Sequence, residues 1–540
     1  MQKNRHPLTI LYGVVLLLIL GAMLTYNLES YMDILFWDES NYMVGGLRLW
    51  SRFNRAWGPS YTVWYKLLSY IQPDSLLLYY INYKLTTVLT PIFAFLFMLG
   101  IGLSVEISFL LSCGFLFSTF NMPVWPHVSH FCLLLFFTSG IITSFIKNSA
   151  IKWAIWVITF YIMANARPEY YLSFCLIFLS WIIYLIYNHN YKRLYVFFVL
   201  GFLALGHYII GIPLLQGKVD RSGMAFTQHL AKNHYDSIGL VGKNFWLHWP
   251  DYYKDVFGND SLSFLQALKS KPEIVMGHIF TNLIHYFKEM ARFLLEVFTI
   301  NDKMPLQFSI LKIFAVLVFL FFLYGKTKSI DKKKSWKLKR HTFWASLLLI
   351  LPLPISVLLI YPRAHYLILQ LPLLFCIVSL WFTGRTSYSY FITGAIMFMI
   401  FGFSMAATPK AKDFTYFDLY RNKVHEKRNY DAVQYIRNQR FEDSLTIMDN
   451  EGYLNNFLRP FVDRGWGGYE AKNGFAEFMH DKRINLLYVT PSLTEDRYLR
   501  LDSNFTHLIA SPEKYGFEKH IYGDYDAYFI IDKKLKRKLR

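Results

Sequence analysis

Long apolar stretches recur along most of this chain, with short polar segments between them. A helix that crosses a bilayer needs roughly 20 predominantly apolar residues. About eleven stretches meet or approach that length, so the pattern predicts a polytopic α-helical membrane protein. The expected spans lie near residues 8–26, 82–103, 107–120, 129–146, 151–165, 169–187, 194–215, 306–324, 342–361, 364–383 and 388–407. The third and fifth are short, which leaves the count open by about two.

The first apolar stretch follows Lys3 and Arg5, a pattern that a secretory signal peptide shares. Its apolar part is long, however, and no small-residue cleavage site follows it. We therefore predict an uncleaved membrane anchor.

The pattern changes after Pro409, where polar and apolar residues are mixed. A helix is expected over Tyr430–Asn438. Strand-like runs lie at Ser444–Met448, Ile484–Thr490 and Ala527–Ile531. We predict a membrane domain over residues 1–407 and a small soluble α/β domain over 408–540.

The formal net charge of +19 raises the question of nucleic-acid binding. The Lys and Arg residues gather instead in short segments between apolar stretches, as in cytoplasmic loops under the positive-inside rule. These segments are the amino terminus, Lys147–Lys152, Asn188–Arg193, the 326–340 run and Gly384–Arg385. Since 54% of the residues are hydrophobic, we expect a membrane protein with lipid contacts and no nucleic-acid partner.

The same rule places the remaining loops outside the cytoplasm. They are the 27–81 loop, the 121–128 loop, the 216–305 segment, the Tyr361–Arg363 turn and the segment after Thr408. Within the 216–305 segment, Glu273–Ile300 has apolar residues at helical spacing, so we expect a helix that lies along the membrane interface.

The four cysteines, Cys113, Cys132, Cys175 and Cys376, all lie in apolar runs, so neither a disulfide framework nor a cysteine zinc site is expected.

Candidate chemistry begins just after the first span. The 27–81 loop contains the adjacent acids Asp38 and Glu39 within Phe36–Tyr42, followed by Gly58–Tyr61 and Trp64–Tyr65. A middle span opens with Ala-Arg-Pro-Glu-Tyr-Tyr at 166–171. Together with the many spans and the outer carboxyl-terminal domain, these stretches resemble the GT-C superfamily of membrane glycosyltransferases. The nearest branch holds protein O-mannosyltransferases, aminoarabinose transferases of lipid A and RgtA/B/C/D-like bacterial enzymes.

The resemblance implies transfer of a sugar from a polyprenyl-phosphate donor to a glycan, lipid or protein acceptor of the cell envelope by an inverting mechanism. Such a transfer needs a base for the acceptor hydroxyl, and a carboxylate can serve. Asp38 is the candidate base. Glu39 would raise its proton affinity, orient the acceptor or bind a metal. The plain alternative is that both acids are merely solvated.

A lipid-phosphate leaving group calls for fixed cations, because arginine can grip phosphate in a bidentate fashion. Arg167 at the head of a span is one candidate, although Pro and Glu after it are also ordinary helix-start residues. Family members often have a basic or aromatic residue in the turn between two late spans, so Arg363, His365 and Tyr366 are donor-binding candidates by resemblance. The alternative is that these side chains snorkel toward headgroups.

One departure from the family is the absence of an acid in the 121–130 stretch, where many members have a second one. His127 and His130 are three residues apart and could share a helix face. Two histidines do not complete a metal site, so His127, His130 and Glu39 are only weak candidates for a possible divalent metal ion.

Two other classes of protein remain open. An O-antigen polymerase or ligase also has many spans and a large outer loop, but it needs neither the paired acids nor a soluble carboxyl-terminal domain. A lipid-linked sugar flippase or transporter would show internal repeats and midplane charges. Here most ionisable residues lie near the outer rim, and the chain has no evident repeat.

The basic loops generate a topology prediction. We expect the amino terminus and the 326–340 run in the cytoplasm and the segment after Thr408 outside, in a bacterial plasma membrane. A reporter enzyme that works only outside the cytoplasm should be active when fused to the chain's end. Activity of a cytoplasm-only reporter at that position would put the proposed active face on the wrong side.

Overall fold

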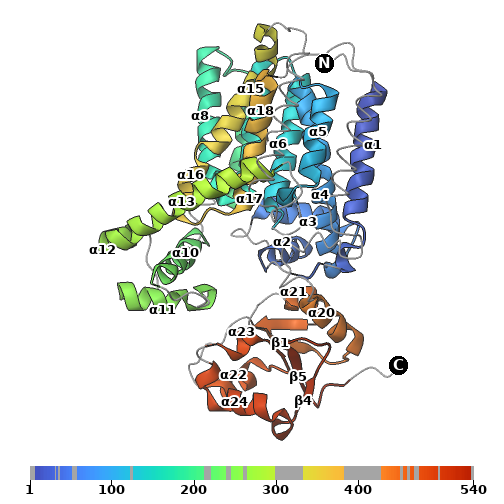
Figure 1. Cartoon of the computed structure of the whole chain (residues 1–540), viewed down its shortest axis with the longest axis vertical. Coiled ribbons are helices and arrows are strands. Elements are labelled where there is room, and N and C mark those ends of the chain that lie inside the picture. The colour runs from blue at the N-terminus through green and yellow to red at the C-terminus, as the bar shows by residue number, and fades with distance from the viewer. Residues whose placement is uncertain are drawn as a thin grey trace. The chain divides into compact units, whose positions relative to one another are not determined.

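The computed structural model describes fourteen stretches of the chain, and its elements are shown in Figure 1. They are residues 7–30, 32–34, 37–51, 58–121, 126–211, 221–238, 245–258, 264–297, 332–381, 427–449, 454–458, 462–466, 474–496 and 499–536. The chain divides into two compact units. The helical unit comprises Met1–Tyr26, Phe53–Tyr61 and Tyr83–Asp413, and the sheet unit comprises Asn27–Arg52, Thr62–Asn82 and Phe414–Arg540.

Within the described residues, six helical stretches are long and apolar enough to cross a membrane. They are Pro7–Ser30, Ser75–Gly100, Val128–Phe145, Ser149–Ala166, Pro168–Tyr187 and Lys339–Leu359. Shorter apolar helices cover Val105–Leu116, Leu194–Ile210 and His365–Leu380. The prediction of a largely helical protein with several helices apolar enough to cross a membrane is therefore confirmed. The expected spans 306–324 and 388–407 lie outside the described residues.

These stretches correspond to a series of helices in the order of the chain. The series is α1 (Pro7–Leu24), α4 (Ser75–Gly100), α5 (Val105–Leu116), α6 (Val128–Phe145), α7 (Ser149–Ala166), α8 (Tyr171–Tyr187), α9 (Leu194–Ile210), α15 (Lys332–Ile350), α16 (Leu353–Leu359), α17 (Ala364–Leu367) and α18 (Leu371–Trp381). Many of them run in roughly the same direction in Figure 1, among them α1, α5, α6, α15 and α18. Close packing is possible at Gly140 of α6, where a Cβ atom would lie 2.4 Å from the Phe97 ring of α4.

Helix α4 begins seven residues before the expected start at 82, because polar residues cap it. Asp74 accepts a hydrogen bond from the backbone N–H of Leu77 at 3.0 Å, which satisfies one of the free amides of a helix start. Hydropathy alone does not detect such a start, since the first turns carry tyrosines and an asparagine rather than a purely aliphatic run.

Four helices from the predicted 216–305 outer segment form a group with its own core. They are α10 (Arg221–Ser237), α11 (Phe245–Phe257), α12 (Phe264–Ser270) and α13 (Pro272–Glu296). Their shared apolar cluster includes Phe226, Leu230, Tyr252, Tyr253 and Val275. The expected helix over Glu273–Ile300 is therefore present as α13.

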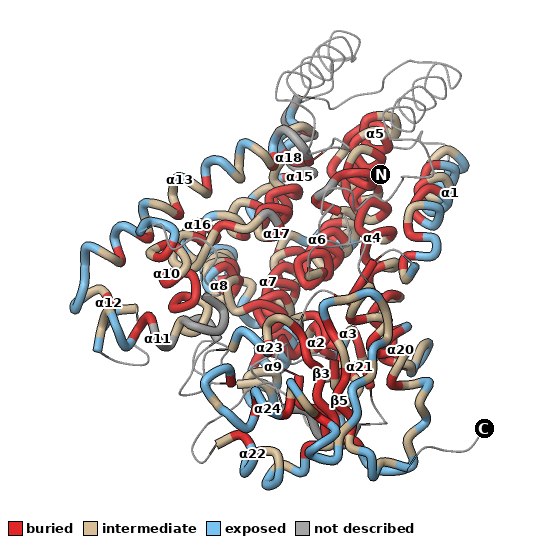
Figure 2. The backbone as a smooth tube through the Cα atoms, turned by 60° about the horizontal axis from the view of Figure 1, so that its bottom comes forward, coloured by how far each residue is buried: buried red, intermediate tan, exposed pale blue. Residues whose placement is uncertain are grey.

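Helix α13 has two distinct faces. Exposed apolar residues recur along one face at helical spacing, and exposed and buried positions alternate along the helix in Figure 2. They are Met276, Phe280, Ile284, Phe287 and Leu294. The other face buries polar as well as apolar side chains, including His278 and Asn282. An apolar stripe of this kind suits the interfacial position expected from the sequence, which stays a prediction.

The sheet unit contains a five-stranded sheet with the order β2-β1-β3-β5-β4. The strands are β1 (Leu445–Asp449), β2 (Val462–Trp466), β3 (Leu486–Val489), β4 (Phe517–His520) and β5 (Tyr528–Asp532). Strand β1 is parallel to both β2 and β3, whereas β5 is antiparallel to β3 and β4. The three strands expected from the sequence are the three inner ones. The two that the sequence pattern missed are the edge strands, which carry charged residues and lack a continuous apolar run.

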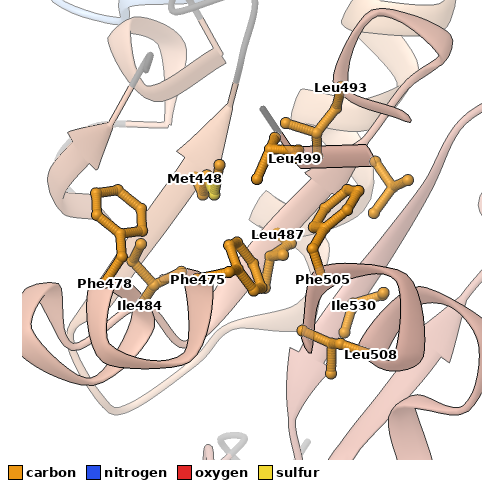
Figure 3. Packing of buried hydrophobic residues seen from close by; sticks show 11 residues of the cluster. Met448, Phe475, Phe478, Ile484, Leu487, Leu493, Leu499, Phe505, Leu508 and Ile530 are labelled. Atoms are coloured by element: carbon orange, nitrogen blue, oxygen red, sulfur yellow. The ribbon is translucent and has the colours of Figure 1, made fainter. Parts of the chain in front are cut away.

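Helices cover the sheet, and an apolar core lies between them. Figure 3 shows side chains of α22 (Phe475–Lys482) and α24 (Ser503–Ala510) next to those of the sheet. Met448, Leu487 and Ile530 come from β1, β3 and β5, and Phe475 and Phe505 come from the two helices. On alternate strand positions, Phe529 stacks on Tyr435 of α20 (Arg428–Gln439) with ring centroids 5.8 Å apart. The remaining elements are η1 (Leu28–Ser30), α2 (Trp37–Leu47), α3 (Pro59–Ser69), η2 (Thr119–Asn121), η3 (Pro168–Tyr170), η5 (Ile368–Gln370), α21 (Leu454–Phe457), α23 (Pro491–Thr494), η7 (Leu499–Leu501) and η8 (Pro512–Tyr515).

Buried polar contacts join segments of the first predicted outer loop to the carboxyl-terminal part of the sheet unit. Asp33 accepts hydrogen bonds from the backbone N–H groups of Asn429 at 3.1 Å and Tyr430 at 2.7 Å, at the start of α20. The Asn429 side chain donates to the carbonyl of Ile34 at 3.1 Å. Arg437, near the end of α20, donates to Asp74 at 2.7 Å. A carboxylate at a helix start is favourable because it pairs with free amides and the helix dipole.

Asp33 generates a prediction about pH. Burial raises the pKa of this carboxyl from 3.8 to about 7, although the helix amides oppose the shift. The folded protein then binds the proton more tightly than the unfolded chain, so the stability due to Asp33 falls as pH rises from about 4 to about 7. The apparent melting temperature of the purified protein in detergent should therefore fall over this range more than that of Asp33→Asn. A pH-independent difference between the two proteins would contradict the effect of burial.

Candidate functional site

The two candidate acids occupy the first turn of α2 in the sheet unit. Asp38 and Glu39 are consecutive helical residues, so their side chains leave the axis about 100° apart. Glu39 is fully buried, whereas Asp38 is only half-buried. The structure therefore gives the paired acids of the sequence two different environments.

Glu39 is held in a buried hydrogen-bond network. Its Oε1 atom accepts from the hydroxyl of Tyr65 at 2.6 Å and from Nδ2 of Asn82 at 2.9 Å. Asn82 Nδ2 also lies 2.9 Å from the Tyr65 hydroxyl, and Trp64 Nε1 donates to Asn82 Oδ1 at 2.8 Å. Three helices, α2, α3 and α4, thus meet at one carboxylate. A buried carboxylate that receives several donors is fixed in position.

Close packing of α2 on α3 brings Tyr65 to Glu39. A Cβ atom at Gly46 would lie 2.6 Å from Cβ of Tyr65 and 2.7 Å from the carbonyl oxygen of Thr62. Any larger residue at Gly46 would push the two helices apart. The glycine pair in α2 therefore serves helix contact, and this contact sets the reach of the Tyr65 hydroxyl.

In the helical unit, Arg167 lies at the junction between α7 and η3. Its backbone is extended, with φ −144° and ψ 119°, so the chain leaves the helix there and restarts at Pro168. The guanidinium donates to Ser129 at 3.2 Å and to Glu169 at 3.0 Å. Its Cζ atom lies 4.5 Å from the centroid of the Tyr366 ring, in a cation–π contact. Glu169, the expected helix-start acid, instead pairs with Arg167.

Arg363 lies in the turn before α17 and contacts helix α10. Its Nη2 atom donates to Nε2 of His229 at 3.0 Å. Since an arginine has no acceptor, the His229 Nε2 atom must be the unprotonated one. Burial, with Arg363 nearby, keeps the pKa of His229 well below its ordinary value, so this histidine is neutral. Tyr361 stacks on the His229 ring at 5.1 Å.

The turn itself is anchored by a buried polar network on α10 and α13. Asn282 Nδ2 donates to the carbonyls of Leu358 at 2.8 Å and Ile360 at 3.2 Å. Asn233 Nδ2 donates to Asn282 Oδ1 at 2.9 Å. These carbonyls belong to the end of α16, where the helix runs out of intrahelical donors. Helices α10 and α13 thereby fix the backbone just before Arg363.

The four donor-binding candidates lie in one cluster of the helical unit. Arg167 contacts Tyr366, whose ring lies 4.4 Å from the ring of His365. His365 is buried and lies within electrostatic range of both Arg167 and Arg363. The sequence presented Arg167 and the 361–366 turn as two separate places, and the fold brings them together. We call Arg167, Arg363, His365, Tyr366 and His229 the basic cluster.

Two residues at or next to the basic cluster, His229 and Tyr170, could not be identified as site residues from the sequence. His229 lies in the 216–305 segment, which carries no motif, and only the packing of α10 against the turn reveals its role. Tyr170 is 1% exposed, and in the described part of the chain its hydroxyl has no hydrogen-bond partner. It lies within electrostatic range of Arg167, Glu169 and Tyr366. A buried hydroxyl beside a guanidinium offers a further donor to an anion.

The weak metal candidates do not form a metal site among the described residues. No group of three His, Cys, Asp or Glu side chains there could hold an ion. His127 and His130 are both buried, and their rings stack with centroids 4.0 Å apart and planes at 19°. His127 Nδ1 instead lies 2.5 Å from the Thr86 hydroxyl. Glu39 lies in the sheet unit within its own network.

No protein-family model matches this chain, and no curated protein matches it either. The functional proposal is therefore built on the residues of the basic cluster and of the acidic turn of α2.

The Glu39 network generates a stability prediction. Glu39→Ala removes the oxygen that accepts from the Tyr65 hydroxyl and from Asn82 Nδ2, which should cost about 2–6 kcal/mol at roughly 1–3 kcal/mol for each of the two bonds. Glu39→Gln keeps an acceptor oxygen and should cost less. The apparent melting temperature in detergent measures both effects, with Asp38→Ala as the half-buried control. Equal losses for Glu39→Ala and Asp38→Ala would contradict the assigned difference between the two acids.

Proposed function

We propose that this protein is a GT-C-type glycosyltransferase that moves a sugar from a polyprenyl-phosphate donor to an extracytoplasmic acceptor. The acceptor is a glycolipid, a surface glycan or a protein. The observation that carries the proposal is the basic cluster, in which two arginines, two histidines and a tyrosine from three separate segments meet beside membrane helices. Such a set of fixed donors suits a phosphate group at the end of a lipid.

The charges of the cluster favour an anion. Glu169 compensates part of the charge of Arg167, and Arg363 donates to the neutral His229. The guanidinium groups of Arg167 and Arg363 both lie within electrostatic range of His365, so two cations converge there. A departing polyprenyl phosphate gains negative charge on its bridging oxygen, and guanidinium groups stabilise that charge best.

The acidic turn of α2 suits the other half of the reaction. A general base must reach the acceptor hydroxyl, so a half-buried carboxylate is better placed for this work than a fully buried one. Asp38 therefore takes the role of base. Glu39 is the positioning residue, because its network fixes the helix turn that carries Asp38.

The reaction is an inverting displacement at the anomeric carbon. The acceptor oxygen forms a bond to that carbon while the bond to the phosphate oxygen breaks. The acceptor proton goes to Asp38, and the electron pair of the broken bond leaves with the polyprenyl phosphate. No oxidant or metal ion is needed to balance this step.

We propose a membrane topology together with this activity. It includes about eleven spans, a cytoplasmic amino terminus and an extracytoplasmic carboxyl-terminal domain in a bacterial plasma membrane. The product would then be a component of the cell envelope, such as a modified lipopolysaccharide or a glycosylated protein.

Asp38→Asn is the central test. This change keeps the size of the side chain and removes its basicity, so transfer from a polyprenyl-phosphate sugar should fall at least about a hundredfold. Donor binding and the amount of protein in the membrane should not change. The measurement compares sugar transfer to membrane glycans, and then by purified protein, with Glu39→Gln as the neighbouring control. Near-parental transfer by purified Asp38→Asn would remove the base from the proposal.

Arg363 supplies a second test. Arg363→Lys keeps the charge but loses the planar fork and its bond to His229, so the KM for donor should rise about tenfold or more. Arg363→Ala should be worse. Lys254→Gln on α11 is the control, since Lys254 is an exposed cation of the same group of helices. If both Arg363 variants used donor as well as the parent, the phosphate site would have to be sought at Arg167 alone.

A further inference from the structure

A second group of basic residues lies at the other ends of the membrane helices in the helical unit. Lys152 lies in the first turn of α7, and Lys339, Arg340 and His341 lie in α15. Arg167 ends α7, and fifteen residues of helix at about 1.5 Å each place it roughly 22 Å from Lys152. This group, which we call the inner basic site, is therefore separate from the basic cluster of the proposed function.

Three of its four members are removed from solvent. Lys339 is 2% exposed, His341 is 5% exposed and Lys152 is 8% exposed. Only Arg340 is an exposed residue. The Lys339 ammonium donates to the carbonyl of Ser379 at 2.6 Å, near the end of α18. Helices α15 and α18 lie side by side in Figures 1 and 2, and α7 also contacts α15. Lys339 thus faces α18, whereas Lys152 and His341 lie where α7 contacts α15.

The charges in this site are of one sign. Arg340 lies within electrostatic range of both Lys152 and His341, and Lys152 lies within range of His341. Across the described stretches of the chain, none of Lys152, Lys339 and Arg340 forms an ion pair with a carboxylate. His341 Nδ1 is buried there without a hydrogen-bond partner. The Trp153 ring closes one side, with its centroid 5.7 Å from that of His341.

These buried like charges lower the stability of the folded protein unless an anion binds between them. Burying an ammonium group without a counter-charge carries a large desolvation penalty, and neighbouring like charges add repulsion. A phosphate group would supply negative charge and several acceptor oxygens to the ammonium, guanidinium and imidazole donors. Basic pockets between membrane helices are the usual places where anionic lipid headgroups bind on the cytoplasmic side.

We propose that Lys152, Arg340 and His341 form a binding site for a phosphate-bearing anion at this end of the helical unit. An anionic phospholipid headgroup is the source that the position at the ends of membrane helices favours. A soluble phosphate compound is the other source. The site is independent of the proposed sugar transfer.

The test measures the melting temperature of the full chain in neutral detergent. Three ligands are added in turn: phosphatidylglycerol, zwitterionic phosphatidylcholine and inorganic pyrophosphate. The variants are Lys152→Gln, Arg340→Gln and the double variant. Lys192→Gln is the matched control, since Lys192 is an exposed basic residue in the loop between α8 and α9.

Phosphatidylglycerol should raise the melting temperature of the parent and of Lys192→Gln. The shift should fall to about half or less in Arg340→Gln and disappear in the double variant, because each cation contributes to holding the phosphate. Without lipid, Lys152→Gln should melt at a higher temperature than the parent, since it removes an uncompensated charge. A shift with pyrophosphate alone would keep the site and assign it to a soluble ligand.

Three results would overturn the proposal. The first is an equal shift with phosphatidylcholine, which would show a general lipid effect. The second is a full phosphatidylglycerol shift in Arg340→Gln, a variant of an exposed residue that should fold normally. The third is a lower melting temperature of Lys152→Gln in lipid-free detergent, which would mean that the protein already compensates this ammonium.

Discussion

A polar or charged side chain that loses water must find its partners inside the protein, and this constraint organises every part of the structure that bears on function. Unpaired buried groups cost far more than paired ones contribute, so the chain arranges helices around them. Glu39 draws α2, α3 and α4 together through Tyr65 and Asn82. Arg167 draws Ser129 and Glu169 to the break between two membrane helices.

The same constraint explains why adjacent acids can differ in role. Glu39 is satisfied by fixed donors and cannot leave them without penalty, so it is suited to hold geometry rather than to exchange protons. Asp38 starts from the same turn but keeps partial access to solvent. Many sites that remove a proton at a defined position contain one fixed residue that holds the geometry and one accessible residue that serves as the base.

Hydrophobic pattern was enough to predict the helical membrane architecture and the three inner strands, because burial in lipid or in a sheet core leaves long apolar runs. It was not enough for β2 and β4, whose edge positions tolerate charge, nor for the polar start of α4. The sequence identified Arg167 and Arg363 as two separate candidate cations. It could not predict that they lie near each other, because this depends on how α7, α10 and the turn before α17 pack across nearly 200 residues of chain. His229 had no sequence signal at all, since a lone histidine on an amphipathic helix is usually a core residue.

The bonds between Asp33 and α20 join residues 396 and 397 positions apart. A ribosome delivers the first of these residues to the membrane long before it makes the second, at roughly 5–20 residues per second. For that interval of tens of seconds the segment that leads into the acidic turn lacks its buried partners. The buried contacts of the Asp33 segment are then among the last to form in biogenesis, and a chain truncated before α20 would lack them.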